Sequence, residues 1–503
     1  MQGFQGTSAG RRGVWISRLR FWAPLGLIAL LALLFCRIHP PYTYDDAYIT
    51  YRYARNFALG HGFVYNVGDR FLGTSAPLYG LLLGILGWPA PDSIPALSAG
   101  LSALAIALTG MGLFWMGWYL EVPFCGLLAA LFYVLDPILY ETLGGEMVFQ
   151  VALVVWAFAC LVARRPTASA VLLALATLTR PDAIIAAVIF AGYGLLRDRR
   201  LPLAAIAVYG LVLLPFLIAA KLYYGAFLPD TLAAKSAQLA SGHWPSFLRG
   251  SAAAFRQRWR TVPAGTLYPW LPLLGLPFLP RFRDWTPLIL WPAAVALVYK
   301  VLNVPFYHWY LVPLVLGLAV LSALAVAGVI ETILRLRQSR HPEANPDPKR
   351  PSPNAQRLLQ MAVVLVLLVV AGARARYQAA LRAHPPDYPH YLQNVHVAQW
   401  LRAQTPPAAS VGYEEIGIIG YFSDRPIVDA LGLVTPLVAA QIRQAHFEWA
   451  FEHYRPDYIL AKPQNDPFLP PHKPAPWKQA YRKVTVIFQP GMPPMTVYKR
   501  QNR

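Results

Sequence analysis

The residues best suited to chemistry lie in one segment, Tyr44–Pro77, directly after the first apolar stretch of the chain. Two adjacent acids, Asp45 and Asp46, lie at its start, and arginines, tyrosines and a glycine-rich turn follow. A carboxylate can remove a proton from an acceptor hydroxyl, while Arg, Lys or His stabilises a departing phosphate. Beside an apolar stretch, this combination predicts transfer of a group from a lipid phosphate.

A helix over residues 46–59, with Asp45 near its N-cap, would place the two acids on different faces. One face combines the first acid with arginines at spacings of three and four residues: Asp45, Tyr48, Arg52 and Arg55. The other face is an apolar stripe headed by the second acid: Asp46, Ile49, Tyr53 and Phe57. Because the two environments differ, the two carboxyl groups should titrate differently. The plainer alternative is that Asp45 only caps the helix and Asp46 pairs with an arginine.

A glycine-rich turn follows this helix and returns the chain to the membrane. Its members are Gly60, His61, Gly62, Asn66, Gly68 and Gly73. His61 is the titratable side chain among them, and we count it with Arg52 and Arg55 as a candidate substrate-binding residue.

More charged residues are expected in other outer loops. They are Arg180 and Asp182 in LTRPD, Lys235 in YYGAFLPDTLAAK, and His308 in NVPFYHWYLVP. Each has a plain structural explanation: Arg180 can pair with Asp182, and His308 can be an interfacial histidine beside Trp309. Ionisable residues near the ends of short membrane segments are costly, so their convergence from several loops indicates a site.

The composition identifies a polytopic membrane protein. Of 503 residues, 56% are hydrophobic and only 14% charged, and the mean hydropathy is +0.40; the chain is more apolar and less charged than ordinary globular domains. The first apolar run, 21–36, follows four arginines and lacks a cleavage site, so we expect a retained anchor with a cytoplasmic N-terminus. Ten further runs bring the expected total to about eleven crossings: 95–119, 122–138, 147–163, 167–179, 182–196, 202–222, 265–280, 285–302, 309–330 and 358–374.

Clusters of arginine and lysine support this topology, because such clusters remain in short cytoplasmic loops. The clusters at 164–165, 197–200, 281–283 and 335–357 all fall on the N-terminal side of the membrane. The short run 77–88 must then stay on the outer side as an interfacial or re-entrant helix. The net charge of +20 is therefore mainly a topology signal, and nucleic acid is not an expected partner.

Two domains are expected. Residues 1–375 form a transmembrane catalytic domain with an outer loop at 40–90. Residues 376–503 form an extracytoplasmic α/β domain with short strands in SVGYE, PIVDA, PDYILA, VTVIF and TVYKR. A charged, proline-rich linker is expected at 341–354 on the cytoplasmic side. Three cysteines, Cys36, Cys125 and Cys160, fall inside the expected spans and suggest neither a disulfide nor a metal site.

The sequence resembles the GT-C superfamily of polyprenyl-phosphate-sugar-dependent glycosyltransferases, most closely the bacterial group that includes the terminal β-1,2-arabinofuranosyltransferases. The resemblance lies in the first outer loop, from DDAYITYRYARNFALGHGF onward, in LTRPD, in YYGAFLPDTLAAK and in GYEEIGIIGYFSDRPIVDALGL. These blocks occur in the family order and cover most of the chain.

The resemblance implies a GT-C fold in a bacterial plasma membrane and an inverting glycosyl transfer. An Asp of the first-loop pair would be the general base, and Asp45 is the preferred one. Arg180 and Lys235 would lie on the donor-phosphate side, with Asp182 and His308 beside them, and Glu415 would contact the acceptor. The donor would be a polyprenyl-phosphate sugar such as arabinofuranose or mannose, and the acceptor an envelope glycan, lipid or protein.

Three questions stay open at the level of sequence. Some GT-C enzymes use a divalent metal, and this chain has no HxxH, DxD or Cys cluster that settles the matter. A non-catalytic envelope protein that binds glycans could keep the same fold. A secondary transporter is the other alternative, although transporters usually place their charges near the bilayer midplane within repeated segments.

Overall fold

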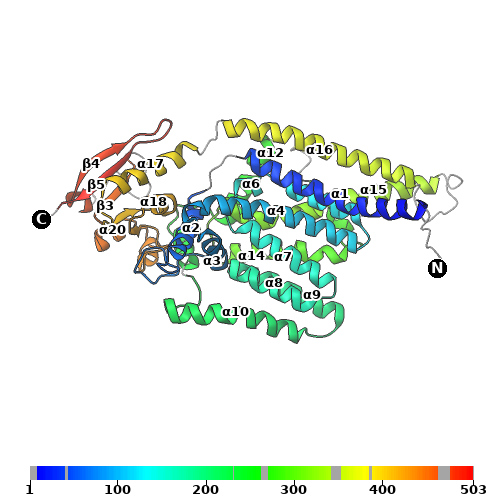
Figure 1. The fold of residues 1–503 in the computed structure, drawn as a ribbon, viewed down its shortest axis with the longest axis horizontal. Helices are drawn as coiled ribbons and strands as arrows, with labels where there is room; N and C mark the ends of the chain where they lie inside the picture. The colour runs from blue at the N-terminus through cyan, green and yellow to red at the C-terminus, as the bar shows by residue number, and fades with distance from the viewer. Residues whose placement is uncertain are drawn as a thin grey trace, which may run out of the picture.

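The computed structural model describes residues 8–39, 44–229, 231–261, 270–340, 353–383, 388–462 and 476–501. Figure 1 shows an elongated helical bundle with a small α/β domain at one end, where the chain also ends. The N-terminal helix begins at the opposite end of the bundle (Figure 1).

The bundle consists mainly of apolar helices that match the runs expected from the sequence. They are α1 (Ser8–Ile38), α4 (Ile94–Tyr119), α5 (Pro123–Val134), α6 (Ile138–Glu141), α7 (Met147–Val162), α8 (Pro166–Thr179), α9 (Ile184–Asp198), α10 (Leu203–Tyr224), α13 (Leu271–Gly275), α14 (Thr286–Val301), α15 (Val312–Arg340) and α16 (Pro353–Ala383). Several of them carry proline in the first turn, where the missing N–H costs no helical hydrogen bond. The sequence prediction of helices is therefore confirmed for these runs, except at 265–280. There 265–269 lie outside the described residues, and the rest forms only α13 and a short 3-10 helix, Leu276–Phe278.

Within the described ranges, five helices are long and apolar enough to cross a membrane. They cover Arg20–Ile38, Pro91–Tyr119, Leu203–Tyr224, His308–Leu336 and Gln356–Ala380, and four apolar helices of 10–17 residues accompany them. A 12-residue helix such as α5 is only about 18 Å long, which is less than the hydrocarbon core of a bilayer. The expected total of eleven crossings thus stays a prediction.

The segment after α1, expected from the sequence to lie on the outer side, forms two helices, α2 (Asp45–Ala58) and α3 (Pro77–Gly87), joined by the glycine-rich turn. Its glycines Gly60, Gly62 and Gly68 have φ of +82°, +87° and +97°, a region that other residues rarely adopt. Two more helices, α11 (Thr231–Ala240) and α12 (Phe247–Thr261), lie in the long connection after α10.

The C-terminal domain contains one five-stranded mixed sheet in the order β2-β1-β3-β5-β4. The strands are β1 (Val411–Tyr413), β2 (Ile427–Asp429), β3 (Tyr458–Ala461), β4 (Tyr481–Ile487) and β5 (Met495–Arg500). β1 pairs in parallel with both β2 and β3, whereas β5 runs antiparallel to β3 and β4. All five strands were expected from the sequence.

Helices cover this sheet: α17 (Tyr388–Gln404), α18 (Ile416–Ser423), α19 (Val438–Ile442), α20 (Trp449–Tyr454) and α21 (Pro476–Gln479). α16 continues to Ala383, past the expected domain boundary at residue 376. The expected linker at 341–354 falls almost wholly outside the described residues.

The C-terminal domain packs against α2 through α18, as the adjacent ribbons in Figure 1 show. Two glycines of α18 allow this close approach. A Cβ atom at Gly417 would lie 1.8 Å from the main-chain oxygen of Asp45, and one at Gly420 would lie 2.0 Å from the hydroxyl of Tyr65. The short sequence IGIIG therefore allows the C-terminal domain to lie directly against α2 and the glycine-rich turn.

Candidate active site

A cavity of about 310 Å³ lies between α2 and the ends of α8, α9, α11 and α14. Four predicted site residues line it: Asp46, Arg180, Asp182 and Lys235. Its other polar lining residues include Tyr44, Thr74, Ser75, Glu146, Tyr299 and Tyr310. The cavity thus brings together predicted residues from three separate segments of the chain, as their convergence in the sequence predicted.

Asp46 and Lys235 form an ion pair at the centre of this arrangement. The Lys235 ammonium donates to Oδ2 of Asp46 at 2.9 Å and lies 3.7 Å from the centroid of the Tyr307 ring. The side chain of Lys235 is only 10% exposed, whereas that of Asp46 is 32% exposed. Burial by itself lowers the pKa of Lys235, but the adjacent carboxylate outweighs burial, so the pKa is raised and the lysine stays charged.

Aromatic rings form the wall beside this ion pair. Trp309 stacks between Tyr44 and Tyr307, each with ring centroids 4.6 Å away. His308 meets Tyr44 edge to face at 5.3 Å. His308 therefore packs behind the wall, and it is not among the residues that line the cavity.

A second charged group surrounds Arg180. The guanidinium donates to Glu146 at 2.6 Å and to Asp182 at 3.2 Å, and its side chain is 8% exposed. Asp182 also accepts hydrogen bonds from Gln150 and Tyr299. The expected pairing of Arg180 with Asp182 is present, and Glu146 is a further partner.

Asp45 points away from the cavity and caps a helix of the other domain. Its carboxylate accepts hydrogen bonds from the N–H groups of Gly417 and Ile418, at 2.8 and 2.7 Å. These groups lie in the first turn of α18, where unpaired N–H groups favour an anion. Burial raises the pKa of Asp45 to about 7, and the charge of Glu415 adds to the rise, while the two N–H groups oppose it.

The plainer alternative from the sequence, in which Asp45 only caps its own helix and Asp46 pairs with an arginine, is wrong. The N-cap of α2 is Tyr44, which has no side-chain cap hydrogen bond. Asp45 caps α18 instead, and Asp46 pairs with Lys235.

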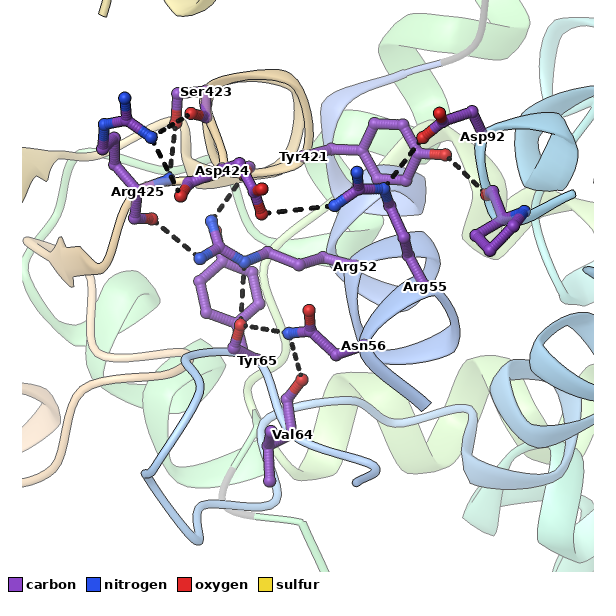
Figure 2. Close-up of polar contacts among 12 residues, drawn as sticks. Arg52, Arg55, Asn56, Val64, Tyr65, Asp92, Tyr421, Ser423, Asp424 and Arg425 are labelled. Atoms are coloured by element: carbon purple, nitrogen blue, oxygen red, sulfur yellow. Dashed lines mark hydrogen bonds and ion pairs between the residues drawn. The ribbon is translucent and has the colours of Figure 1, made fainter. Parts of the chain in front are cut away.

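Arg52 and Arg55 also face the C-terminal domain. Arg52 donates to three main-chain oxygens, those of Tyr65, Gly420 and Arg425, at 2.6 to 2.7 Å. Arg55 bonds Asp92 at 3.0 Å and Asp424 at 3.2 Å. Figure 2 shows both guanidinium groups between α2 and the segment that follows α18. This geometry gives the two arginines a role in holding the domains together and places neither in the cavity lining.

Glu415 belongs to a separate polar cluster on the C-terminal domain. His390 and Asn394 contact its carboxylate at 2.8 and 3.0 Å, and Lys462 lies at 3.3 Å. Burial alone would raise the pKa of Glu415, but the hydrogen bond from His390 and the charge of Lys462 lower it to about 2. The same contact with Glu415 raises the pKa of His390.

His61 lies exposed on the glycine-rich turn and is not part of the cavity lining. Within the residues that the structure describes, no cluster of three or more His, Cys, Asp or Glu side chains is arranged to hold a metal ion.

The chain is similar to one family model and to several solved structures. A family model described as "Domain of unknown function (DUF8728)" matches residues 379–498. No curated protein is similar enough in sequence to count as a match. Among solved structures, ArnT from Cupriavidus metallidurans bound to undecaprenyl phosphate is similar at a TM-score of 0.57 and 15% identity, over 96% of this chain and 97% of that chain.

The Archaeoglobus fulgidus oligosaccharyltransferase, tethered to an acceptor peptide containing the NVT sequon, is similar at a TM-score of 0.57 and 14% identity. The similarity covers 97% of this chain and 75% of that chain. This chain has the GT-C fold. The expected fold is therefore confirmed, whereas membership of the superfamily and the narrower resemblance to arabinofuranosyltransferases remain predictions.

Several residues of the cavity were missed in the sequence as site residues: Tyr44, Glu146, Tyr299, Trp309 and Tyr310. The aromatic ones carried little signal, because the chain has 27 tyrosines and 15 tryptophans. Glu146 carried more, since an acid directly before the apolar run 147–163 is costly unless it has a partner.

Proposed function

We propose that this protein is a membrane glycosyltransferase. It moves a sugar from a polyprenyl-monophosphate donor to a hydroxyl of an extracytoplasmic glycan, lipid or protein, in a bacterial plasma membrane. The observation that carries the proposal is the buried Asp46–Lys235 ion pair in a cavity that also contains Arg180. The known structures of similar fold support the donor class, since one of them holds undecaprenyl phosphate.

The donor phosphate would bind the cationic side of the cavity. Lys235 and Arg180 both line it, and charge-assisted hydrogen bonds to phosphate oxygens are strong. An apolar wall of Ile184, Ile185 and Val298 continues from these cations, and Ile184 is 50% exposed at the side of the bundle. This wall suits the first isoprene units of the donor.

Binding of the phosphate would also free the base. In the structure Lys235 is bonded to Asp46. A phosphate competes for the same ammonium, so the Asp46 carboxylate is released to accept the proton of the acceptor hydroxyl. The hydroxyl oxygen then attacks the anomeric carbon, the bond to the phosphate oxygen breaks, and the configuration inverts. Polyprenyl phosphate leaves with its charge stabilised by Lys235 and Arg180.

The geometry favours Asp46 over Asp45 as the base. Asp46 lines the cavity, whereas the carboxylate of Asp45 is bonded to the main chain of α18. Asp45 instead fixes the start of α2 and so helps to position Asp46. This preference reverses the one drawn from sequence resemblance.

The decisive experiment measures transfer of labelled sugar from synthetic polyprenyl-phosphate arabinofuranose and from polyprenyl-phosphate mannose to native membrane extract. Wild type should transfer from one of them. Asp46→Asn should lose about a hundredfold to ten-thousandfold in rate, as expected for removal of a general base. Asp45→Asn is the matched control, because Asn also caps helices, and it should keep at least a tenth of the rate.

The outcomes separate the alternatives. Loss of transfer in Asp45→Asn with normal transfer in Asp46→Asn would reverse our assignment of the base. If wild type binds glycan but transfers sugar from neither donor, the protein would be a non-catalytic glycan-binding protein. The identity of the accepted donor would name the sugar.

A further inference from the structure

A second cavity, of about 760 Å³, lies among α1, α4, α5, α15 and α16. It is at the other end of the bundle from the catalytic cavity, because it is lined by Arg20, while Tyr44 follows the far end of the same helix. The helix between Arg20 and Ile38 is about 27 Å long, close to the thickness of the hydrocarbon core. The two cavities therefore lie near opposite faces of the membrane.

Basic residues from three distant parts of the chain meet in this cavity. They are Arg20 on α1, Arg281 before α14, and Arg357 on α16. Two acids, Glu121 and Glu331, also line it. The three arginines come from the clusters that the sequence placed on the cytoplasmic side, and their meeting at one end of the bundle agrees with that topology.

Within the described part of the chain, some of the charged side chains in the cavity have ion-pair partners and others do not. Glu331 pairs with Arg281 and also with Arg335, at 3.0 Å for the latter. Among the described residues, neither Arg20 nor Arg357 forms an ion pair, and both are exposed. Three arginines and two glutamates line the cavity, and Glu331 is also paired with Arg335 outside the lining, which leaves positive charge for an anionic ligand.

Apart from Gln356 and Gln360, the remaining lining is apolar and aromatic, with Phe114, Trp118, Phe124, Leu127 and Ile330 among its members. Trp118 is 39% exposed, and Trp22 and Tyr119, close to it in the same two helices, are 64% and 48% exposed. Exposed tryptophan and tyrosine are typical of the headgroup level of a membrane. The cavity therefore combines a cationic rim with an apolar wall at the depth of lipid phosphates.

We propose that this cavity binds an anionic phospholipid of the cytoplasmic leaflet. Its headgroup phosphate contacts Arg20 and Arg357, and an acyl chain packs along Phe114, Trp118 and Leu127. Basic pockets between membrane helices on this side are suited to such headgroups. The bound lipid joins α1 to the start of α16, so it stabilises the bundle without taking part in sugar transfer.

The test uses the purified full-length protein, delipidated and titrated with phosphatidylglycerol or phosphatidylcholine, with bound lipid counted by native mass spectrometry. The test variant is Arg20→Gln with Arg357→Gln. The matched control is Arg199→Gln with Arg200→Gln, which removes two exposed arginines outside the cavity.

Wild type and the control variant should each bind one phosphatidylglycerol molecule. The test variant should bind phosphatidylglycerol with about tenfold lower affinity, because two arginine contacts are lost. Phosphatidylcholine should not replace it. Equal binding of phosphatidylglycerol by all three proteins would overturn the proposal. So would displacement of the lipid by inorganic phosphate at equal concentration, because a free anion would then be the ligand. The single variant Arg357→Gln, with an intermediate loss expected, guards against misfolding of the double variant.

Discussion

The two sides of helix α2 use the same kinds of residues for opposite purposes. On the cavity side, Asp46 meets Lys235, and the carboxylate keeps a third of its surface exposed. On the domain side, Asp45 and Arg52 are bonded to main-chain groups of the C-terminal domain. Charges that face an open cavity remain available to a substrate, whereas charges that satisfy a buried main chain hold the fold together.

After loss of the base Asp46, removal of Lys235 from the cavity should have the largest effect. Lys235→Ala should lower kcat/KM for the lipid donor by about a hundredfold, because one charge-assisted contact to phosphate is lost. The measurement is sugar transfer at varied donor concentration. Lys235→Arg keeps the charge and is the control, with a loss of about tenfold or less. Equal activity of Lys235→Ala and wild type would remove the cavity from the proposed mechanism.

On the domain side, Arg52→Gln should reduce stability and leave the donor KM unchanged in the folded fraction. The loss should be about 3 kcal/mol, because three main-chain oxygens in a buried site lose a charged donor. Arg55→Gln is the matched variant. Its partner Asp92 is 86% exposed, so its loss should stay near 1 kcal/mol or below.

Thermal unfolding followed by tryptophan fluorescence compares Arg52→Gln with Arg55→Gln. If Arg52→Gln instead raises the donor KM and leaves the stability unchanged, Arg52 binds substrate, as the sequence analysis predicted.

The domain interface should also depend on pH. Asp45 has a folded pKa of about 7, raised from 3.8, so the folded state holds a proton that the unfolded state releases. Its contribution to stability is therefore full below about pH 4 and declines as the pH rises to about 7. Glu415, with a pKa lowered to about 2, acts in the opposite sense, but only below about pH 4.5.

Asp45→Asn removes this titration and should flatten the decline in melting temperature between pH 5 and pH 8. At pH 8 the variant should melt several degrees above wild type. An unchanged slope would show that Asp45 does not titrate in this window.

The aromatic wall gives the smallest expected effect. Tyr307 lies under the Lys235 ammonium and donates its hydroxyl to Gln238 at 2.8 Å. Tyr307→Leu removes the ring and should raise the donor KM about threefold to fivefold, in line with a cation–π contact of about 1 kcal/mol. Tyr307→Phe keeps the ring and should stay within about twofold. A similar effect of both variants would assign the role to the hydroxyl.

Local patterns were sufficient for much of the fold. The apolar runs predicted the helices of the bundle, and the β-rich runs predicted all five strands of the C-terminal domain. These elements depend on the period and length of nearby residues, which a sequence displays directly. The length of an apolar run did not give the length of its helix. The run at 122–138 forms the 12-residue helix α5, which is too short to cross a bilayer alone.

The candidate site was only partly predictable. The sequence indicated that Asp46, Arg180, Asp182 and Lys235 lie in outer loops, and the cavity contains all four. It did not separate them from Arg52 and Arg55, because arginine spacing on a helix looks the same whether the face meets a ligand or a protein domain.

The sequence by itself determined the kinds of groups available: two acids at the start of an outer helix, cations in other loops, and the helices and strands that carry them. Only the tertiary structure decided that Asp46 faces the cavity and Asp45 the C-terminal domain. Adjacent residues on a helix point about 100° apart, so one of them can meet a different partner from the other. The partner of Asp45 lies 372 positions away at Gly417, and a contact at that separation depends on how the whole chain packs.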